Sequence, residues 1–317
     1  IGQDTRRVDA ISKATGTAQF GIDVDVPGMH YAVVVRAPVA RAKARSVNAA
    51  SAKRMPGVTN IFEISNGVAV VAESFWQAKQ AAAKIHVQWE SLPLESVSTE
   101  TLRRDYAAAL DTGDGVEGPR EGDVDAAMRS ASTTHEAEYW APLLSQSPLE
   151  PMNAVVSIEG DEADVWTGIQ FPSAVPGLVS RIADIPAKNV RFHQTYLGGG
   201  FGRRGTPSHL VEAAEIAKAT GKPIQLVWTR EDDVRHGPFR PASLMRIRAG
   251  VDDAGNLTAW DASRAGGNIS PDIFRGLLPA LYPWIGDGMV EGIANLSEWY
   301  FEKFVSDESS TWGLFED

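Results

Sequence analysis

LGGGFGRRG, residues 197–205, carries five glycines between an expected strand and an expected helix. Glycine has no Cβ, so successive backbone N–H groups in such a turn can converge on an anion or a polar ligand atom. Arg203 and Arg204 add positive charge that suits a phosphate group. The pattern predicts a ligand-binding turn; the alternative is a plain strand-to-helix turn with surface arginines.

Two nucleotide-binding motifs compete for this segment. Residues 200–205 satisfy G-x-G-x-x-G, the dinucleotide fingerprint, from Gly200 through Gly202 to Gly205. However, the preceding strand carries several polar side chains, whereas a central parallel strand is normally an unbroken apolar run. A P-loop fails outright, because Thr206-Pro207 stands where Lys followed by Ser or Thr is required. An NAD(P)-dependent Rossmann dehydrogenase therefore stays open only as an alternative.

Alternating apolar residues and turn signals predict the elements around this segment. Residues 153–160 and 163–170 predict a hairpin that turns near Asp161. A helix is expected to begin with Thr206 as its cap and to end at Gly221. Further strands are expected over residues 189–197, 223–230, 243–251 and 256–264, and a further helix over residues 172–185.

The N-terminal part predicts a compact α+β domain over residues 1–90. The dipeptide Asn66-Gly67 between two apolar runs indicates a hairpin with a type I′ turn. The Ala-rich stretch over residues 75–84 predicts a helix. A polar, Gly-rich linker is expected over residues 91–123, and a second α+β domain over residues 124–267. The poorly periodic tail over residues 268–317 is expected to be an incomplete domain.

Composition narrows the classes of protein. The 317 residues are 43% hydrophobic, enough for two domains of roughly 150 residues each. The net charge of −11 argues against a nucleic-acid partner. The chain has no cysteine, which excludes iron–sulfur ligation and thiolate metal sites within it. No apolar run approaches the roughly 20 residues that span a bilayer, so no transmembrane segment is expected. Because residue 1 is Ile, we expect a longer natural N-terminus.

Four segments in the expected order resemble one family. GGGFGRR at residues 198–204, SPLEPMNAVV at 147–156, ADVWTGIQFP at 163–172 and LVWTREDD at 226–233 are similar to the molybdenum-binding subunit of the xanthine oxidase family. The resemblance is greatest to the isoquinoline 1-oxidoreductase beta-subunit and aldehyde dehydrogenase large-subunit branch. Residues 6–39 resemble the family's aldehyde oxidase/xanthine dehydrogenase hammerhead domain.

The resemblance implies an α+β fold, with a hammerhead-like domain followed by a partial molybdopterin-binding domain. It implies molybdopterin with Mo, in the cytosine dinucleotide form, and hydroxylation of N-heteroaromatic or aldehyde substrates with water as the oxygen source. It also implies a small iron–sulfur partner subunit with 2Fe–2S clusters. Further molybdenum-binding segments, upstream and C-terminal, are expected outside this chain. A bacterial-type location is implied, and both cytoplasm and periplasm stay open.

Residue by residue, the resemblance places a cofactor-binding loop at Gly199, Gly200, Phe201 and Gly202. Gln170 matches the family's glutamine that hydrogen-bonds the ligand sphere of molybdenum. Arg203 is expected near the cofactor phosphate, with a solvated surface charge as the alternative for it and for Arg204. Glu150 is expected to brace the site or to be a structural carboxylate at a turn.

The sequence departs from the family pattern in two ways. Gly205 stands where purine-oxidising relatives place a glutamate, which argues against xanthine as a substrate. The family's general-base glutamate belongs to a later domain, so this chain alone is expected to be almost inactive.

Glu231, Asp232 and Asp233 are expected to form a solvated turn. A non-catalytic assembly module that binds no cofactor is a further alternative.

Overall fold

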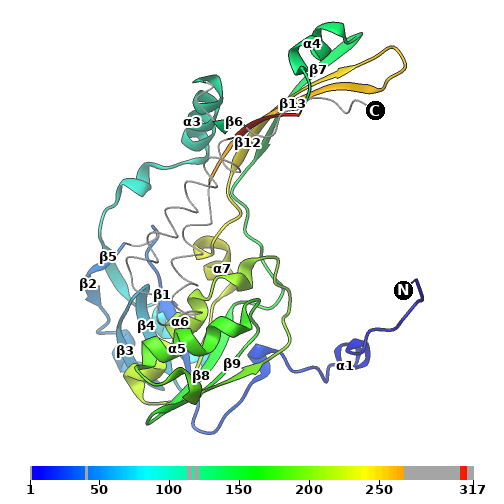
Figure 1. Ribbon diagram of the computed structural model, residues 1–317. Coiled ribbons are helices and arrows are strands. Elements are labelled where there is room, and N and C mark those ends of the chain that lie inside the picture. The colour runs from blue at the N-terminus through cyan, green and yellow to red at the C-terminus, as the bar shows by residue number, and fades with distance from the viewer. Residues whose placement is uncertain (1, 40–41, 113–115, 118–120, 268–307, 313–317) are drawn as a thin grey trace. The chain divides into compact units, whose positions relative to one another are not determined.

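The computed structural model describes residues 2–39, 42–112, 116–117, 121–267 and 308–312, which form two compact units (Figure 1). The first unit comprises the described residues of 1–92 and 145–238; the second comprises those of 93–144, 239–267 and 308–312. These units do not coincide with the expected division at residues 90 and 123, because each one combines two separate stretches of the chain. The tail expected after residue 267 lies outside the described residues, except for residues 308–312.

The first unit is built on a seven-stranded mixed sheet in the order β10-β9-β8-β11-β1-β4-β3. Its strands are β1 His30–Val35, β3 Val58–Ile64, β4 Gly67–Ala72, β8 Asn153–Glu159, β9 Glu162–Thr167, β10 Val190–Gln194 and β11 Ile224–Val227. A separate ribbon pairs β2 Ala44–Asn48 with β5 His86–Trp89. Strands from residues 1–90 thus share one sheet with strands from the second stretch, because β1 pairs in parallel with β11.

The topology excludes a Rossmann arrangement at the glycine segment. β10 precedes the segment and β11 follows the next helix, yet β9 and β8 lie between these two strands in the sheet. β8 is antiparallel to both β9 and β11. A dinucleotide-binding βαβ unit needs neighbouring parallel strands on either side of its helix. Residues 200–205 therefore have the spacing of the dinucleotide fingerprint but lie outside the βαβ unit in which that motif binds a dinucleotide.

Helices cover both faces of this sheet (Figure 1). The helices of the first unit are α1 Ala10–Ala14, α2 Phe75–Ala82, α5 Val175–Ala183, α6 Ser208–Thr220 and α7 Arg230–His236. α5 and α6 bury apolar side chains in one core cluster with Ala69 and Val71 of β4. Ala81 of α2 packs in another cluster with Val68 and Val70 of the same strand. Consequently every residue of β4 is buried, and each such valine contributes about 1.5–3 kcal/mol.

Two local predictions need correction. The β3–β4 hairpin is confirmed, but Ile64 pairs with Gly67, so the turn residues are Ser65 and Asn66. Gly67 is instead required by a close approach: a Cβ there would lie 2.3 Å from the carbonyl oxygen of Val35. Helix α6 has Pro207 as its N-cap with no side-chain cap, so the prediction for Thr206 was wrong.

The end of α6 and the second hairpin agree with the sequence. Gly221 ends α6 in the left-handed conformation, with φ +63°. β8 and β9 pair antiparallel from Val155–Trp166 to Glu159–Glu162, so the chain turns at residues 160–161 as expected.

The described residues of the second unit form a five-stranded sheet in the order β6-β14-β13-β12-β7 and two helices. Its elements are α3 Thr99–Thr112, β6 Val116–Glu117, α4 Val124–Ser130, β7 Thr133–Ala141, β12 Ser243–Val251, β13 Leu257–Gly266 and β14 Glu308–Trp312. α3 occupies much of the stretch expected as a linker, because its 14 residues form a continuous helix. Both units mix helices with sheets that contain antiparallel strands, which confirms the α+β class.

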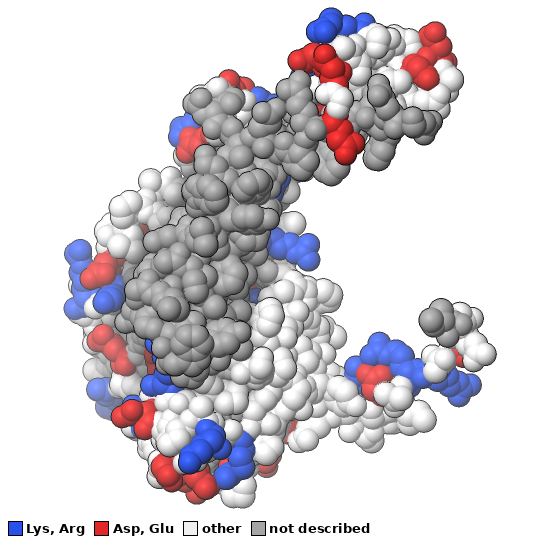
Figure 2. Space-filling model, viewed as in Figure 1, with Lys and Arg blue, Asp and Glu red and all other residues white. Residues whose placement is uncertain are grey.

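The surface carries both signs of charge. On the face seen in Figure 2, basic and acidic side chains lie interspersed, and the described residues there form no continuous basic patch. None of the helices that the structure describes has the length and apolar character needed to span a membrane.

Candidate functional site

The glycine segment is a tightly curled loop between β10 and α6. Gly199, Phe201 and Gly202 all have left-handed backbones, with φ of +99°, +52° and +87°. The amide of Arg203 donates to the carbonyl of Gly200 at 2.8 Å, which closes the turn. A phenylalanine at positive φ is rare, because its Cβ crowds the backbone. The strain at Phe201 therefore marks this loop as a functional candidate.

The outer side of the loop offers free hydrogen-bond donors. Within the described part of the chain, the amides of residues 199–202 have no hydrogen-bond acceptor. Gln170, which follows β9 after Gly168 and Ile169, lies beside them: its backbone amide donates to the carbonyl of Arg204 at 3.1 Å. Its side-chain Oε1 lies 3.1 Å from where a Cβ of Gly200 would be. The Gln170 carboxamide is exposed and bonded to no described residue, so this side presents several donors together.

Two exposed phenyl groups flank these donors. Phe201 is 63% exposed and Phe171, next to Gln170, is 46% exposed. The ring of Phe201 reaches back over Gly199, where a Cβ would lie 3.0 Å from it. The ring of Phe171 lies over Gly205, where a Cβ would lie 3.2 Å from it. The loop thus combines polar backbone with apolar walls.

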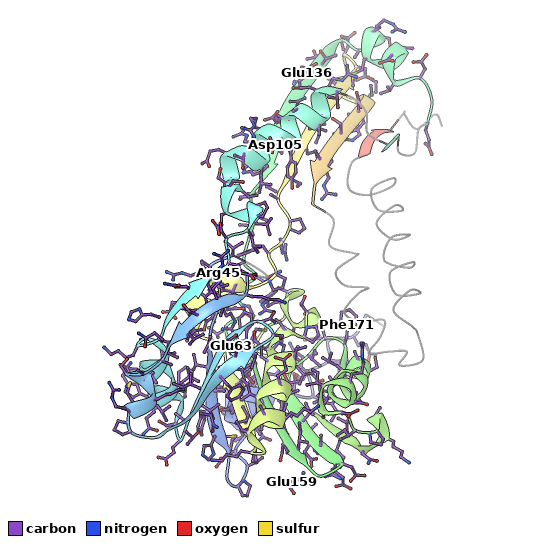
Figure 3. The ribbon with its side chains drawn as sticks, turned by 90° about the vertical axis from the view of Figure 1, so that its left-hand side faces the viewer. Arg45, Glu63, Asp105, Glu136, Glu159 and Phe171 are labelled. Carbon is purple, nitrogen blue, oxygen red and sulfur yellow. The ribbon has the colours of Figure 1, made fainter. Side chains whose placement is uncertain are left out.

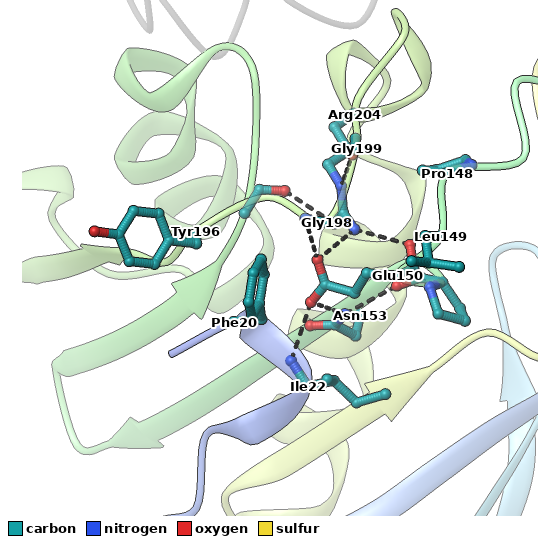
Figure 4. Close-up of polar contacts among 12 residues, drawn as sticks. Phe20, Ile22, Pro148, Leu149, Glu150, Asn153, Tyr196, Gly198, Gly199 and Arg204 are labelled. Carbon is teal, nitrogen blue, oxygen red and sulfur yellow. Dashed lines mark hydrogen bonds and ion pairs between the residues drawn. The ribbon is translucent and has the colours of Figure 1, made fainter. Parts of the chain in front are cut away.

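Arg204 supports the loop from within (Figure 4). Its buried guanidinium donates to the carbonyls of Gly199, Gly168 and Glu150 at 2.8, 3.2 and 3.0 Å. The same group forms an ion pair of 2.7 Å with the Glu150 carboxylate. Burial lowers the pKa of Arg204, and Glu150 opposes this shift. Arg204 is therefore a structural cation, and the alternative of a solvated surface charge at this position is wrong.

Arg203 lies in a second buried network. Its Nε donates to Asp233 Oδ1 at 2.9 Å, and its guanidinium carbon lies 4.7 Å from the ring centre of Trp228. Only 1% of Arg203 is exposed, so it is not a solvated charge. Burial lowers its pKa, and Asp233 opposes that shift. Its two terminal nitrogens have no hydrogen-bond partner among the described residues, and a contact with a cofactor phosphate stays a prediction.

Neighbouring charges complete this network. Arg36, which directly follows β1, is paired with Glu212 of α6, and both side chains are buried. Trp228 Nε1 donates to the same carboxylate at 2.8 Å. Burial raises the pKa of Glu212, and the nearby Arg36 opposes that rise. The loop leads into α6. The core beside this helix therefore contains buried charged side chains, each paired with a side chain of opposite charge.

The structure brings together five of the six predicted cofactor residues, Gln170, Gly199, Gly200, Phe201 and Gly202, and directs the side chain of Arg203 into the core. Sequence reasoning missed Asp233, which was expected in a solvated turn but is buried in the first turn of α7. A signal existed: Thr229 and Asp232 have capping-box spacing, which predicts a helix rather than a loop.

The donors suit a cofactor that carries its own metal. Among the described residues, no group of three or more His, Cys, Asp or Glu side chains could hold a metal ion. The loop supplies instead bare amides and the Gln170 carboxamide, which can donate to oxo or phosphate oxygens without burying a charge. A Cβ at Gly200 would meet Gln170, so the close approach needs glycine. These residues fit molybdopterin bound through hydrogen bonds to the protein.

Sequence comparisons define the class. Residues 111–267 match the family model described as the molybdopterin cofactor-binding domain. The isoquinoline 1-oxidoreductase subunit beta of Brevundimonas diminuta is 34% identical over 260 residues, which are 79% of this chain and 33% of the relative. A membrane-bound aldehyde dehydrogenase (pyrroloquinoline-quinone) of Gluconacetobacter polyoxogenes is 32% identical, over 83% of this chain and 35% of the relative. The chain is thus a molybdopterin-binding protein that spans about a third of these relatives.

Solved structures share the fold. Quinoline 2-oxidoreductase from Pseudomonas putida 86 aligns with a TM-score of 0.63 and 21% identity, over 83% of this chain and 39% of that one. Aldehyde oxidoreductase from Desulfovibrio gigas aligns with a TM-score of 0.63 and 20% identity, over 86% and 35%. These likenesses show the fold, and the sequence matches identify the family: the chain belongs to the molybdenum-binding subunits of xanthine oxidase-type oxidoreductases.

Proposed function

We propose that this chain forms the part of a molybdenum hydroxylase that holds the cofactor beside a substrate, an N-heteroaromatic ring or an aldehyde. The observation that carries the proposal is the row of unbonded amides at residues 199–202 next to Gln170. When bound, the molybdenum centre would supply two-electron oxidation, in which a substrate C–H becomes C–OH, water supplies the oxygen, and two electrons and two protons leave.

The chain's own residues hold and shield that centre. The amides of residues 199–202 donate to cofactor oxygens, and Gln170 adds a neutral donor that leaves the local charge unchanged. Phe201 and Phe171 exclude water beside the donors, which strengthens their hydrogen bonds. Their apolar faces also suit a planar aromatic substrate better than one rich in hydroxyl groups. Gly205 adds no carboxylate to this surface.

The names of the relatives support the finer features of the proposal. The Brevundimonas relative is named for isoquinoline and the Gluconacetobacter relative for aldehyde. Names such as subunit beta and molybdenum-binding subunit suit a chain whose electrons leave to a separate iron–sulfur subunit. The absence of cysteine fits that division. We propose the cytosine dinucleotide form of the cofactor, held partly by the loop.

Metal and nucleotide content test the proposal. The natural full-length protein is purified with its neighbouring gene products and analysed for molybdenum, for CMP released by acid, and for oxidation of isoquinoline and benzaldehyde in isotopically labelled water. We expect one molybdenum per chain, CMP in equal amount, and label in the product. Protein without molybdenum would contradict the proposal and favour an assembly module.

A further inference from the structure

We propose that Glu150 is a positioning residue: its buried carboxylate fixes the curvature of the loop at residues 198–204, so that the amides of residues 199–202 point outward. The inference deepens the proposed function, because it says how the cofactor loop is held in its donor-presenting shape.

The Glu150 carboxylate is saturated with donors (Figure 4). Oε2 accepts from the amide of Gly198 at 2.8 Å and from Arg204 at 2.7 Å. Oε1 accepts from the Asn153 carboxamide at 2.9 Å and from the amide of Ile22 at 3.2 Å. Both oxygens thus face two donors each, in a residue that is 8% exposed. Such charge-assisted bonds are roughly twice as strong as neutral ones.

These bonds hold the loop at both ends. The Gly198 amide ties its first residue directly to the carboxylate, and the Glu150 amide returns a bond to the Gly198 carbonyl at 3.0 Å. Arg204, the last residue of the loop, binds the same carboxylate and also the carbonyl of Gly199. The C=O and N–H groups of one peptide point in opposite directions. The inward carbonyls of Gly198 and Gly199 therefore turn the amides of Gly199 and Gly200 outward. Glu150 therefore fixes the distance between the two ends.

The packing at Gly198 allows little slack. A Cβ there would lie 2.3 Å from the Cβ of Glu150, so only glycine permits this approach. On the other side of the carboxylate, a Cβ at Gly21 would lie 2.3 Å from the Asn153 Oδ1 atom. The N-terminal segment around Ile22 thus packs against the same cluster, and Gln225 holds it there through a bond to the Ile22 carbonyl at 3.2 Å.

No amide can replace this carboxylate without loss. In Glu150→Gln, either orientation of the new side chain turns its NH₂ group toward two existing donors. The variant keeps the size of the residue, but two of the four hydrogen bonds to the carboxylate are lost, because two donors then face the NH₂ group. Glu159→Gln is the matched control, because Glu159 is exposed at the hairpin end of β8. Phe171, whose ring lies against Gly205 beside the loop, follows the opposite end of the paired strand β9 (Figure 3).

Hydrogen exchange of the full-length protein, purified from cells grown without molybdate, measures how well the loop amides are protected when no molybdenum is bound. In the peptide over residues 198–204, the amides of Gly198 and Arg203 donate hydrogen bonds, to Glu150 Oε2 and to the Gly200 carbonyl. For Glu150→Gln we expect exchange of these two amides to rise about ten-fold or more, with exchange in β11 and α6 unchanged. In molybdenum-loaded protein we expect faster loss of molybdenum on dialysis. Glu159→Gln should match the wild type in both measurements. Arg204→Lys, which keeps the charge but loses the fork of donors, should behave like Glu150→Gln and replaces it if that variant does not fold.

Three outcomes would overturn the inference. The first is unchanged exchange in the loop. The second is an equal rise throughout the first unit, which would mean that Glu150 supports the fold as a whole. The third is a looser loop with an unchanged rate of molybdenum loss. Failure of the proposed function is recognised separately, as wild-type protein that contains no molybdenum.

Discussion

Arg203 Nε and Asp233 Oδ1 lie 2.9 Å apart, in a pair whose side chains are 1% and 0% exposed. The pair joins the glycine loop to the first turn of α7. Arg230 also reaches the second oxygen of Asp233, at 3.2 Å. A carboxylate between two guanidinium groups compensates charge that could not otherwise be buried. Asp233 is thus part of the support under the candidate site.

Asp233→Asn should destabilise the first unit by about 3–5 kcal/mol, because it leaves the buried Arg203 without its counter-charge. Urea unfolding followed by tryptophan fluorescence measures this change, since Trp228 lies over the same guanidinium. The control is Glu231→Gln, in the same helical turn but exposed, with an expected change below about 1 kcal/mol. Equal stability of the two variants would show that the buried pair contributes nothing specific.

Glycine substitutions separate backbone strain from contact with the cofactor. Gly202 and Gly28 both have positive φ, +87° and +75°, and an added Cβ would meet no described atom within 4 Å at either position. Each alanine variant should therefore lose about 1 kcal/mol of stability through strain alone. Only Gly202→Ala should also reduce molybdenum content, because only Gly202 belongs to the loop. Equal molybdenum in the two variants would contradict the assignment of the loop.

Gln170 tests the requirement for a neutral donor. Gln170→Ala removes one hydrogen bond, and molybdenum affinity should fall about ten-fold. Gln170→Glu should fall further, because a carboxylate repels the oxo and phosphate oxygens of the cofactor. The exposed residue Gln3 provides a control for added charge, as Gln3→Glu. Elemental analysis after dialysis measures the order. A Gln170→Glu variant that retained more metal than Gln170→Ala would rule out a donor role.

How much the sequence could predict differed between elements and site. Periodicity predicted β12 with the bounds that the structure shows, residues 243–251, and placed both hairpins, because alternation and turn chemistry act over a few residues. The pairing of β1 with β11 joins residues about 190 apart, and no local pattern encodes such a partner. The predicted division at residue 90 depended on that missing information.

In the candidate site too, features that depend on neighbouring residues were predicted, and contacts between residues far apart in the sequence were not. The bare amides at residues 199–202 follow from glycine itself, and the family resemblance added Gln170. The burial of Arg203 and Arg204 did not follow, because a charged side chain in sequence gives no sign of the carboxylate that compensates it. Asp233 and Glu150 lie 30 and 54 residues away from their arginines. Only the fold reveals these pairs.

His209 predicts a dependence of stability on pH. Burial holds the pKa of His209 well below its ordinary value of 6.5, and Arg203 adds to the effect. The unfolded chain therefore binds a proton below pH 6.5 that the folded chain does not bind. Stability from this residue is present above pH 6.5 and is lost as the pH falls below it, by about 1.4 kcal/mol per pH unit. His209→Phe should remove this part of the slope in urea unfolding between pH 6.5 and 5. An unchanged slope would show that the folded protein accepts the proton.

Gly205 and Phe171 should act together. A Cβ at residue 205 would lie 3.2 Å from the Phe171 ring, so Gly205→Glu must displace that ring. We expect this variant to lose about 1–3 kcal/mol through crowding. Phe171→Ala makes room, so the double variant should be more stable than the sum of the single changes predicts, by about 0.5–3 kcal/mol. A double-mutant cycle in urea measures this coupling. If the changes in the free energy of unfolding were additive, the Phe171 ring would not limit the size of the side chain at residue 205.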